Sequence, residues 1–182
     1  MYSFNEAVES PEIWFQKAWG MFEASKINFE AFKNHNSMST DRDRHRKSGL
    51  MSAAKLCLSL AIENGLKGAY VYKLKPEFSK NKYSKNKFSP KHFHERSHDL
   101  GDLAYKLGIE LSQDDNVLLK RFSSFIIWAA KYKSPLSEEE FTEFQGENIL
   151  SYPKDFEFVE HPLEVLQLQS GYSIENGWPY KS

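Results

Sequence analysis

The segment from Ser48 to Tyr72 constrains the fold more than any other part of the chain. Its apolar and small residues recur at spacings of three and four, the period of an α-helix. They form one wide stripe: Leu50, Ala54, Cys57, Leu58, Ala61, Ile62, Gly65, Leu66, Ala69 and Tyr70. Small side chains let a second helix axis come close. A glycine costs about 1 kcal/mol in a helix interior, so we expect a packing reason for Gly65 and Gly68. The segment therefore predicts a buried helix inside a helical bundle.

Several flanking segments carry similar helical signals. We expect an all-α, up-and-down antiparallel bundle of four to five helices with an irregular C-terminal tail. The expected helices lie near residues 11–33, 48–73, 97–107, 113–133 and 137–146. Their starts are indicated by a serine followed by a proline or an acid, at Ser10–Pro11, Ser97–Asp99, Ser112–Asp115 and Ser137–Glu140. Gly108 is typical of a helix end.

The chain divides into two parts by pattern. Residues 1–146 are predicted to form the bundle, with a long basic loop at 75–96. Residues 147–182 are predicted to be an extension packed on it, with a short extended piece before one or two helical turns. Trp178 is expected to anchor the last residues in the surface.

Composition excludes several classes of protein. With 40% apolar residues the chain can bury a core, and a disulfide framework is excluded because there is one cysteine, Cys57, which we interpret as a small core residue. No window approaches 18 unbroken apolar residues, and the start lacks a basic and apolar leader pattern. We therefore expect a cytoplasmic protein that does not enter a membrane.

Charge is unevenly distributed although the net charge is only −1. Residues 73–96 hold eight Lys or Arg against Glu77 and Glu95, whereas residues 136–164 hold nine acids against Lys154. One interpretation is that these segments neutralise each other within the fold or between subunits. The other is that the basic segment meets a polyanion.

The basic segment also interleaves lysines with aromatic residues, which is a pattern typical of single-stranded nucleic-acid binding. The candidate binding residues are Lys80, Lys82, Tyr83, Lys85, Lys87 and Lys91. The alternative is a solvated surface loop without a ligand.

Three sequence motifs together resemble those of a known protein family. The first is AIENGLKG at 61–68, which contains Glu63 and Lys67; the second is SHDLGDLAYKLGI at 97–109, which contains Asp99; the third is WAAKYKSP at 128–135. In this order they resemble the HEPN superfamily of helical-bundle domains.

The resemblance implies a bundle that often pairs as a homodimer and needs no cofactor. Many HEPN members are metal-independent ribonucleases, including toxins and defence effectors; others bind nucleotides or nucleic acid, or hold partner proteins. The ribonucleases carry Arg, four to six residues, then His, but here no histidine follows Arg121 before His161. We therefore expect a member that binds a ligand without cleaving it. A candidate setting is a defence system or a toxin–antitoxin pair. The alternatives are an endoribonuclease with a displaced site and a protein-interaction scaffold.

A displaced site would use Arg96 and His98 as candidate catalytic residues. Cleavage of RNA at a 2′-hydroxyl needs a base for the proton and a cation for the phosphate. The alternative is that His98 packs between helices and anchors the end of the loop. Glu63 and Lys67 are either a helix-stabilising i, i+4 pair or a polar pair at a dimer cleft.

Three histidines near residue 98 are candidate metal ligands. His92, His94 and His98 lie close in sequence, but no carboxylate or cysteine completes a ligand set of known spacing. We therefore expect no metal.

Overall fold

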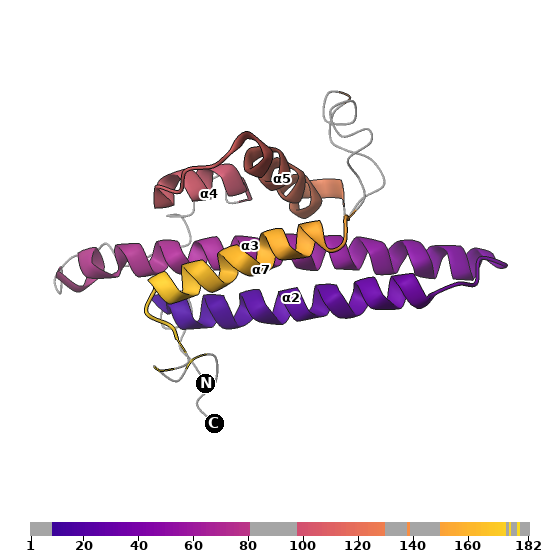
Figure 1. Ribbon diagram of the computed structural model, residues 1–182, viewed down its shortest axis with the longest axis horizontal. Helices are drawn as coiled ribbons and strands as arrows, with labels where there is room; N and C mark the ends of the chain where they lie inside the picture. The colour runs from indigo at the N-terminus through magenta and orange to yellow at the C-terminus, as the bar shows by residue number, and fades with distance from the viewer. Residues whose placement is uncertain are drawn as a thin grey trace.

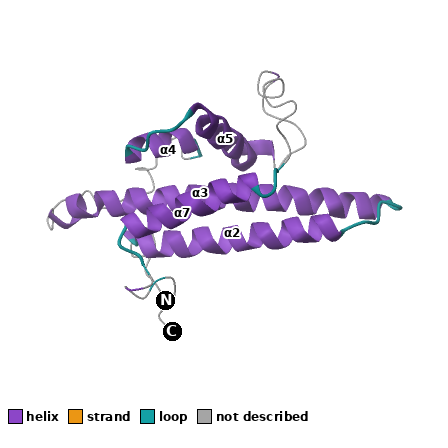
Figure 2. Cartoon of the chain, viewed as in Figure 1, coloured by secondary structure: helices purple, strands orange, loops and turns teal. Residues whose placement is uncertain are grey.

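The computed structural model describes residues 9–80, 98–129, 138, 150–173, 175 and 178, without the side chains of 75–80, 128 and 129. Its regular elements are α2 (Pro11–Asn34), α3 (Asp41–Lys80), α4 (Leu100–Leu107), α5 (Gln113–Ser124), the π-helix η2 (Phe125–Ala129) and α7 (Lys154–Gln169). This part of the chain contains no strand, and the predicted all-α bundle is confirmed (Figure 2). None of its helices is long and apolar enough to cross a membrane.

Helix α3 is the axis of the molecule. Figure 1 shows α2 running antiparallel beside it and α7 lying along this pair. Helices α4 and α5 form a second layer on another side of α3. The arrangement surrounds the middle of α3 with neighbours, which is why its apolar stripe is so wide.

The predicted stripe is buried where these helices meet. Along α3 the buried apolar residues are Ala54, Leu58, Ala61, Ile62, Leu66, Ala69 and Val71. Phe15 and Phe22 come from α2, Leu100 and Leu103 from α4, and Leu163 from α7, and all five are at most 1% exposed. Cys57 is only half-buried, and burial raises the pKa of its thiol, which fits a packed residue rather than a reactive one.

The two glycines of α3 mark its closest contacts. A Cβ on Gly65 would overlap the Leu163 Cδ2 of α7. A Cβ on Gly68 would lie 3.1 Å from the Trp14 Cβ of α2. The predicted packing reason is therefore confirmed, and both close approaches lie within the bundle.

Two helix starts differ from the prediction. Helix α3 begins at Asp41 rather than 48, where Thr40 and Asp43 form reciprocal side-chain to backbone bonds of 3.1 Å. Because this first part of α3 is polar and exposed, it has no apolar period that would reveal it. Helix α3 also continues to Lys80, so the first residues of the predicted basic loop are helical.

Helix α4 begins at Leu100, and its N-cap is Asp99, so Ser97 as the cap was wrong. Its end at Gly108 is confirmed, because Gly108 adopts a left-handed φ of 79°. The Ser112–Asp115 capping box of α5 is also confirmed. The predicted helix at 137–146 and residues 130–133 lie outside the described residues, Glu138 excepted.

The prediction of an irregular C-terminal tail is wrong for residues 154–169. Residues 154–169 form the continuous helix α7 despite Pro162 in its interior. Phe156, Val159, Leu163 and Leu166 follow helical spacing and are buried. Their burial offsets the roughly 3 kcal/mol that an internal proline costs. Trp178 is 4% exposed and packs edge-on against Phe15, as expected.

Candidate functional site

Two of the predicted motifs meet at one polar site. Glu63 and Lys67 lie one turn apart on α3, and the Lys67 Nζ donates to the Glu63 Oε1. The His98 Nδ1, from the turn before α4, lies 3.1 Å from the same oxygen. The structure therefore brings His98 into contact with Glu63 of the Glu63–Lys67 pair, although 35 positions separate His98 from Glu63 in the sequence.

The site has a buried side and an exposed side. Glu63 is 3% exposed and Lys67 is 9% exposed, whereas the His98 side chain is 46% exposed. A buried carboxylate is costly unless it is paired, and Lys67 supplies the opposite charge. The second carboxylate oxygen, Glu63 Oε2, is buried and has no hydrogen-bond partner among the described residues.

The start of α4 fixes where His98 lies. The Leu100 side chain is fully buried, and its backbone N–H donates to the Ser123 Oγ of α5 at 3.1 Å. The Asp99 carboxylate accepts from the Asp102 N–H at 3.0 Å and caps the helix. Asp99 is thus the cap that orients this turn, and it does not contact Glu63. Its role follows from helix capping alone.

A carboxylate that holds one ring nitrogen of a histidine sets the chemistry of the other. If His98 Nδ1 donates to Glu63, the Nε2 is left as an acceptor on the exposed side. An imidazole held in this way can take up a proton or hydrogen-bond a ligand. Because Lys67 also contacts Glu63, the carboxylate charge is compensated within the site.

The remaining candidate residues are not brought to this site by the described structure. Arg96, Lys82, Tyr83, Lys85, Lys87 and Lys91 lie outside the described residues. Lys80 ends α3, and its side chain is outside the description. His92 and His94 also lie outside it, so their proximity to His98 stays a prediction.

A second buried charge cluster had no signal in the sequence. Asp155 on α7 is fully buried, pairs with Arg121 of α5, and accepts from the Ser151 N–H at 2.7 Å. Arg121 and Asp155 are far apart in sequence, and α7 was not expected to be a helix, so no pattern linked them. This ion pair joins the α5 layer to α7.

Lys55 of α3 lies near this ion pair. It is 7% exposed, and its Nζ lies 5.5 Å from the Phe125 ring centroid. Burial, helped by the Arg121 charge, lowers the pKa of Lys55 to about 8 from an ordinary value of 10.5.

The lowered pKa of Lys55 predicts how stability depends on pH. Between about pH 8 and 10.5 the unfolded chain binds this proton more than the folded one, so its contribution to stability rises with pH. Lys55→Met removes this contribution. The difference in unfolding free energy between Lys55→Met and wild type should therefore be most favourable to the variant at pH 7 and should decrease toward pH 10. Urea unfolding at both pH values measures it, and a constant difference would be inconsistent with a buried charged lysine.

No protein-family model, curated protein or solved structure matches this chain. The HEPN resemblance thus stays a prediction that rests on the three sequence motifs.

Proposed function

We propose that this protein is a HEPN-like module that binds nucleic acid or nucleotides through its basic segment at 73–96. The observation that supports this most is the place of His98. The Glu63–Lys67 pair holds His98 two residues after the basic segment ends, with its ring half exposed. An imidazole that can hydrogen-bond a ligand therefore adjoins the most basic stretch of the chain.

The Glu63 carboxylate beside His98 does not oppose an anionic ligand. The negative charge of Glu63 is compensated by Lys67, so it does not repel a phosphate at His98. Lys73 is used structurally, because its Nζ donates to the Lys106 carbonyl oxygen at the end of α4, at 2.9 Å. The other seven bases of the segment follow Lys73 in sequence, and they are the proposed phosphate contacts.

Aromatic residues favour single-stranded nucleic acid as the ligand. Phe78, Tyr83 and Phe88 alternate with the lysines of the segment. Stacking of bases on aromatic rings contributes about 1–3 kcal/mol per base, and it needs unpaired bases. By the family resemblance we also propose a homodimer that acts in defence or in a toxin–antitoxin pair.

A charge-deletion variant tests the binding proposal. The triple variant Lys82→Ala, Lys85→Ala, Lys87→Ala should weaken binding of a 20-nucleotide single-stranded RNA by at least about tenfold at low salt, because three phosphate contacts are lost. The triple variant Lys17→Ala, Lys26→Ala, Lys154→Ala removes the same charge from exposed sites elsewhere and should bind like wild type. Fluorescence anisotropy measures both. Equal affinity of the two variants would contradict the proposed segment.

An endoribonuclease is the second candidate, and the Glu63–His98 contact favours it. A carboxylate-oriented imidazole beside bound phosphates has the parts of a general base. If the protein cleaves RNA, His98→Ala should abolish cleavage while RNA affinity changes little. Binding without cleavage by wild type would support the binding module, and absence of binding at low salt would leave the scaffold alternative.

A further inference from the structure

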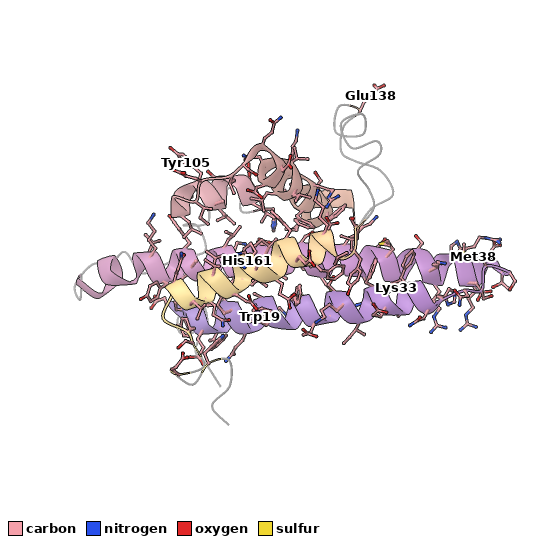
Figure 3. The ribbon with its side chains drawn as sticks, in the orientation of Figure 1. Trp19, Lys33, Met38, Tyr105, Glu138 and His161 are labelled. Atoms are coloured by element: carbon pink, nitrogen blue, oxygen red, sulfur yellow. The ribbon has the colours of Figure 1, made fainter. Side chains whose placement is uncertain are left out.

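The tip of the α2–α3 hairpin, residues 33–47, is a second basic surface. Figure 1 shows this turn projecting beyond the end of α7 and beyond the α4–α5 layer. Lys33 and Met38 mark it in Figure 3, where side-chain nitrogens gather around the turn. It lies at the opposite end of α3 from residues 73–80, the part of the basic segment that the structure describes. The tip is therefore separate from the proposed site at His98.

The acids at the tip are already engaged. Asp41 pairs with Arg44. Asp43 accepts hydrogen bonds from Thr40, Ser37 and Ser39, and these bonds lower the pKa of its carboxyl to about 2. Asp43 stays ionised at the start of α3, but residues 33–47 hold five Lys or Arg against only Asp41 and Asp43, so the tip keeps a net positive charge.

Three basic side chains of the tip have no such hydrogen-bonded or ion-paired partner among the described residues. Arg42, His45 and Arg46 are exposed, and they form no hydrogen bond or ion pair with any residue the structure describes. Their spacing of three and four places them on one face of α3. Cations in the first turns of a helix are opposed by its dipole, so helix stability gives no reason for them. Three of the five arginines in the chain lie within residues 42–46.

We infer that Arg42, His45 and Arg46 form a second contact for the phosphodiester backbone of nucleic acid. This inference takes its ligand class from the proposed function and adds a surface to it. A guanidinium presents paired donors that match phosphate oxygens. Asn34 and Asn36 are exposed at the turn, and asparagine side chains are common phosphate contacts.

Membrane binding fits the tip less well. Membrane-surface segments present an apolar face beside their basic residues. Within residues 33–47 Met38 is the one large apolar side chain that is exposed, at 48%. The side chains of the tip are therefore better suited to the phosphate backbone of a nucleic acid in water than to a membrane surface.

Helix geometry sets the size of ligand that reaches both surfaces. At a rise of about 1.5 Å per residue, Arg46 and Arg42 lie about 26 and 32 Å along α3 from Glu63. At about 3.4 Å per stacked nucleotide, the shorter distance corresponds to roughly eight nucleotides. A 20-nucleotide strand is long enough to contact both surfaces.

The test compares two double variants of the full chain on a 20-nucleotide single-stranded RNA. Arg42→Ala with Arg46→Ala should weaken binding about tenfold at low salt and should reduce the slope of log K against log salt by about 1.4, at about 0.7 for each lost phosphate contact. Lys17→Ala with Lys26→Ala, which removes the same charge from the exposed face of α2, should leave both quantities unchanged. Arg42→Lys with Arg46→Lys should keep the wild-type slope, because the charges remain.

The outcomes separate this inference from the proposed function. If wild type binds RNA and the Arg42/Arg46 double alanine variant matches the α2 control, the inference is wrong and the proposed function stands. If wild type does not bind RNA, both are wrong. Loss of binding to phosphatidylserine vesicles in the alanine variant, with RNA affinity intact, would identify the tip as a membrane surface and would also overturn the inference.

Discussion

Replacing Asp155 with alanine should lower the free energy of unfolding by about 3–5 kcal/mol, because it leaves the charge of Arg121 buried without its partner. Asp155 is fully buried, and the Arg121 side chain is only 12% exposed. The Arg121 Nε is already buried without a hydrogen-bond partner among the described residues, so little can replace the lost contact. The Ser151 N–H would also lose its acceptor. Urea unfolding followed by circular dichroism measures the change.

Two controls separate this effect from damage to α7. Glu157→Ala removes an exposed acid from the same turn and should change stability by less than about 0.5 kcal/mol. Replacing both partners, Arg121→Met with Asp155→Leu, should recover much of the stability, because no unpaired charge stays buried. Equal stability of Asp155→Ala and Glu157→Ala would show that the ion pair does not hold α5 to α7.

Gly65→Leu should lower the free energy of unfolding by roughly 1–3 kcal/mol. The new side chain would occupy the space of Leu163, which is fully buried between α3 and α7. Both helices would have to move apart along their closest contact. Thermal unfolding of the variant beside wild type measures the loss.

Gly20 on α2 is the matched control. It is exposed, and a Cβ there would have no neighbour within 4 Å. Gly20→Leu should therefore stabilise the protein by up to about 1 kcal/mol through helix propensity. A Gly65→Leu variant that is as stable as wild type, or more stable, would contradict the close contact between α7 and Gly65.

The helices that could be predicted from sequence are those with apolar faces. The stripe along 48–72 is predictable because burial on several sides leaves a periodic pattern of apolar residues. Gly65 indicates close packing because a glycine in a helix interior is destabilising unless a neighbour needs the space. The helical conformation of residues 41–47 is not predictable in this way, because these residues are largely polar and exposed and show no apolar period. Helix α7 is not evident in the sequence, because Pro162 and several acids interrupt a buried face that contacts with α2, α3 and α5 stabilise.

The individual residues of the candidate site can be predicted from the sequence, but the contacts between them cannot. The sequence indicates His98 through its pairing with Arg96 at the start of a predicted helix, and Glu63 and Lys67 through their motif. Nothing local places His98 Nδ1 on the Glu63 carboxylate, because that contact depends on how α4 docks on α3. The Arg121–Asp155 pair was missed for the same reason, since a contact between distant residues leaves no periodic trace.

Titration of a single-stranded RNA at several salt concentrations tests the central claim most directly. We expect binding at low salt, with a slope of log K against log salt between about −3 and −6, which corresponds to roughly four to nine phosphate contacts at 0.7 each. Absence of binding at low salt, or an affinity that does not change with salt, would contradict it.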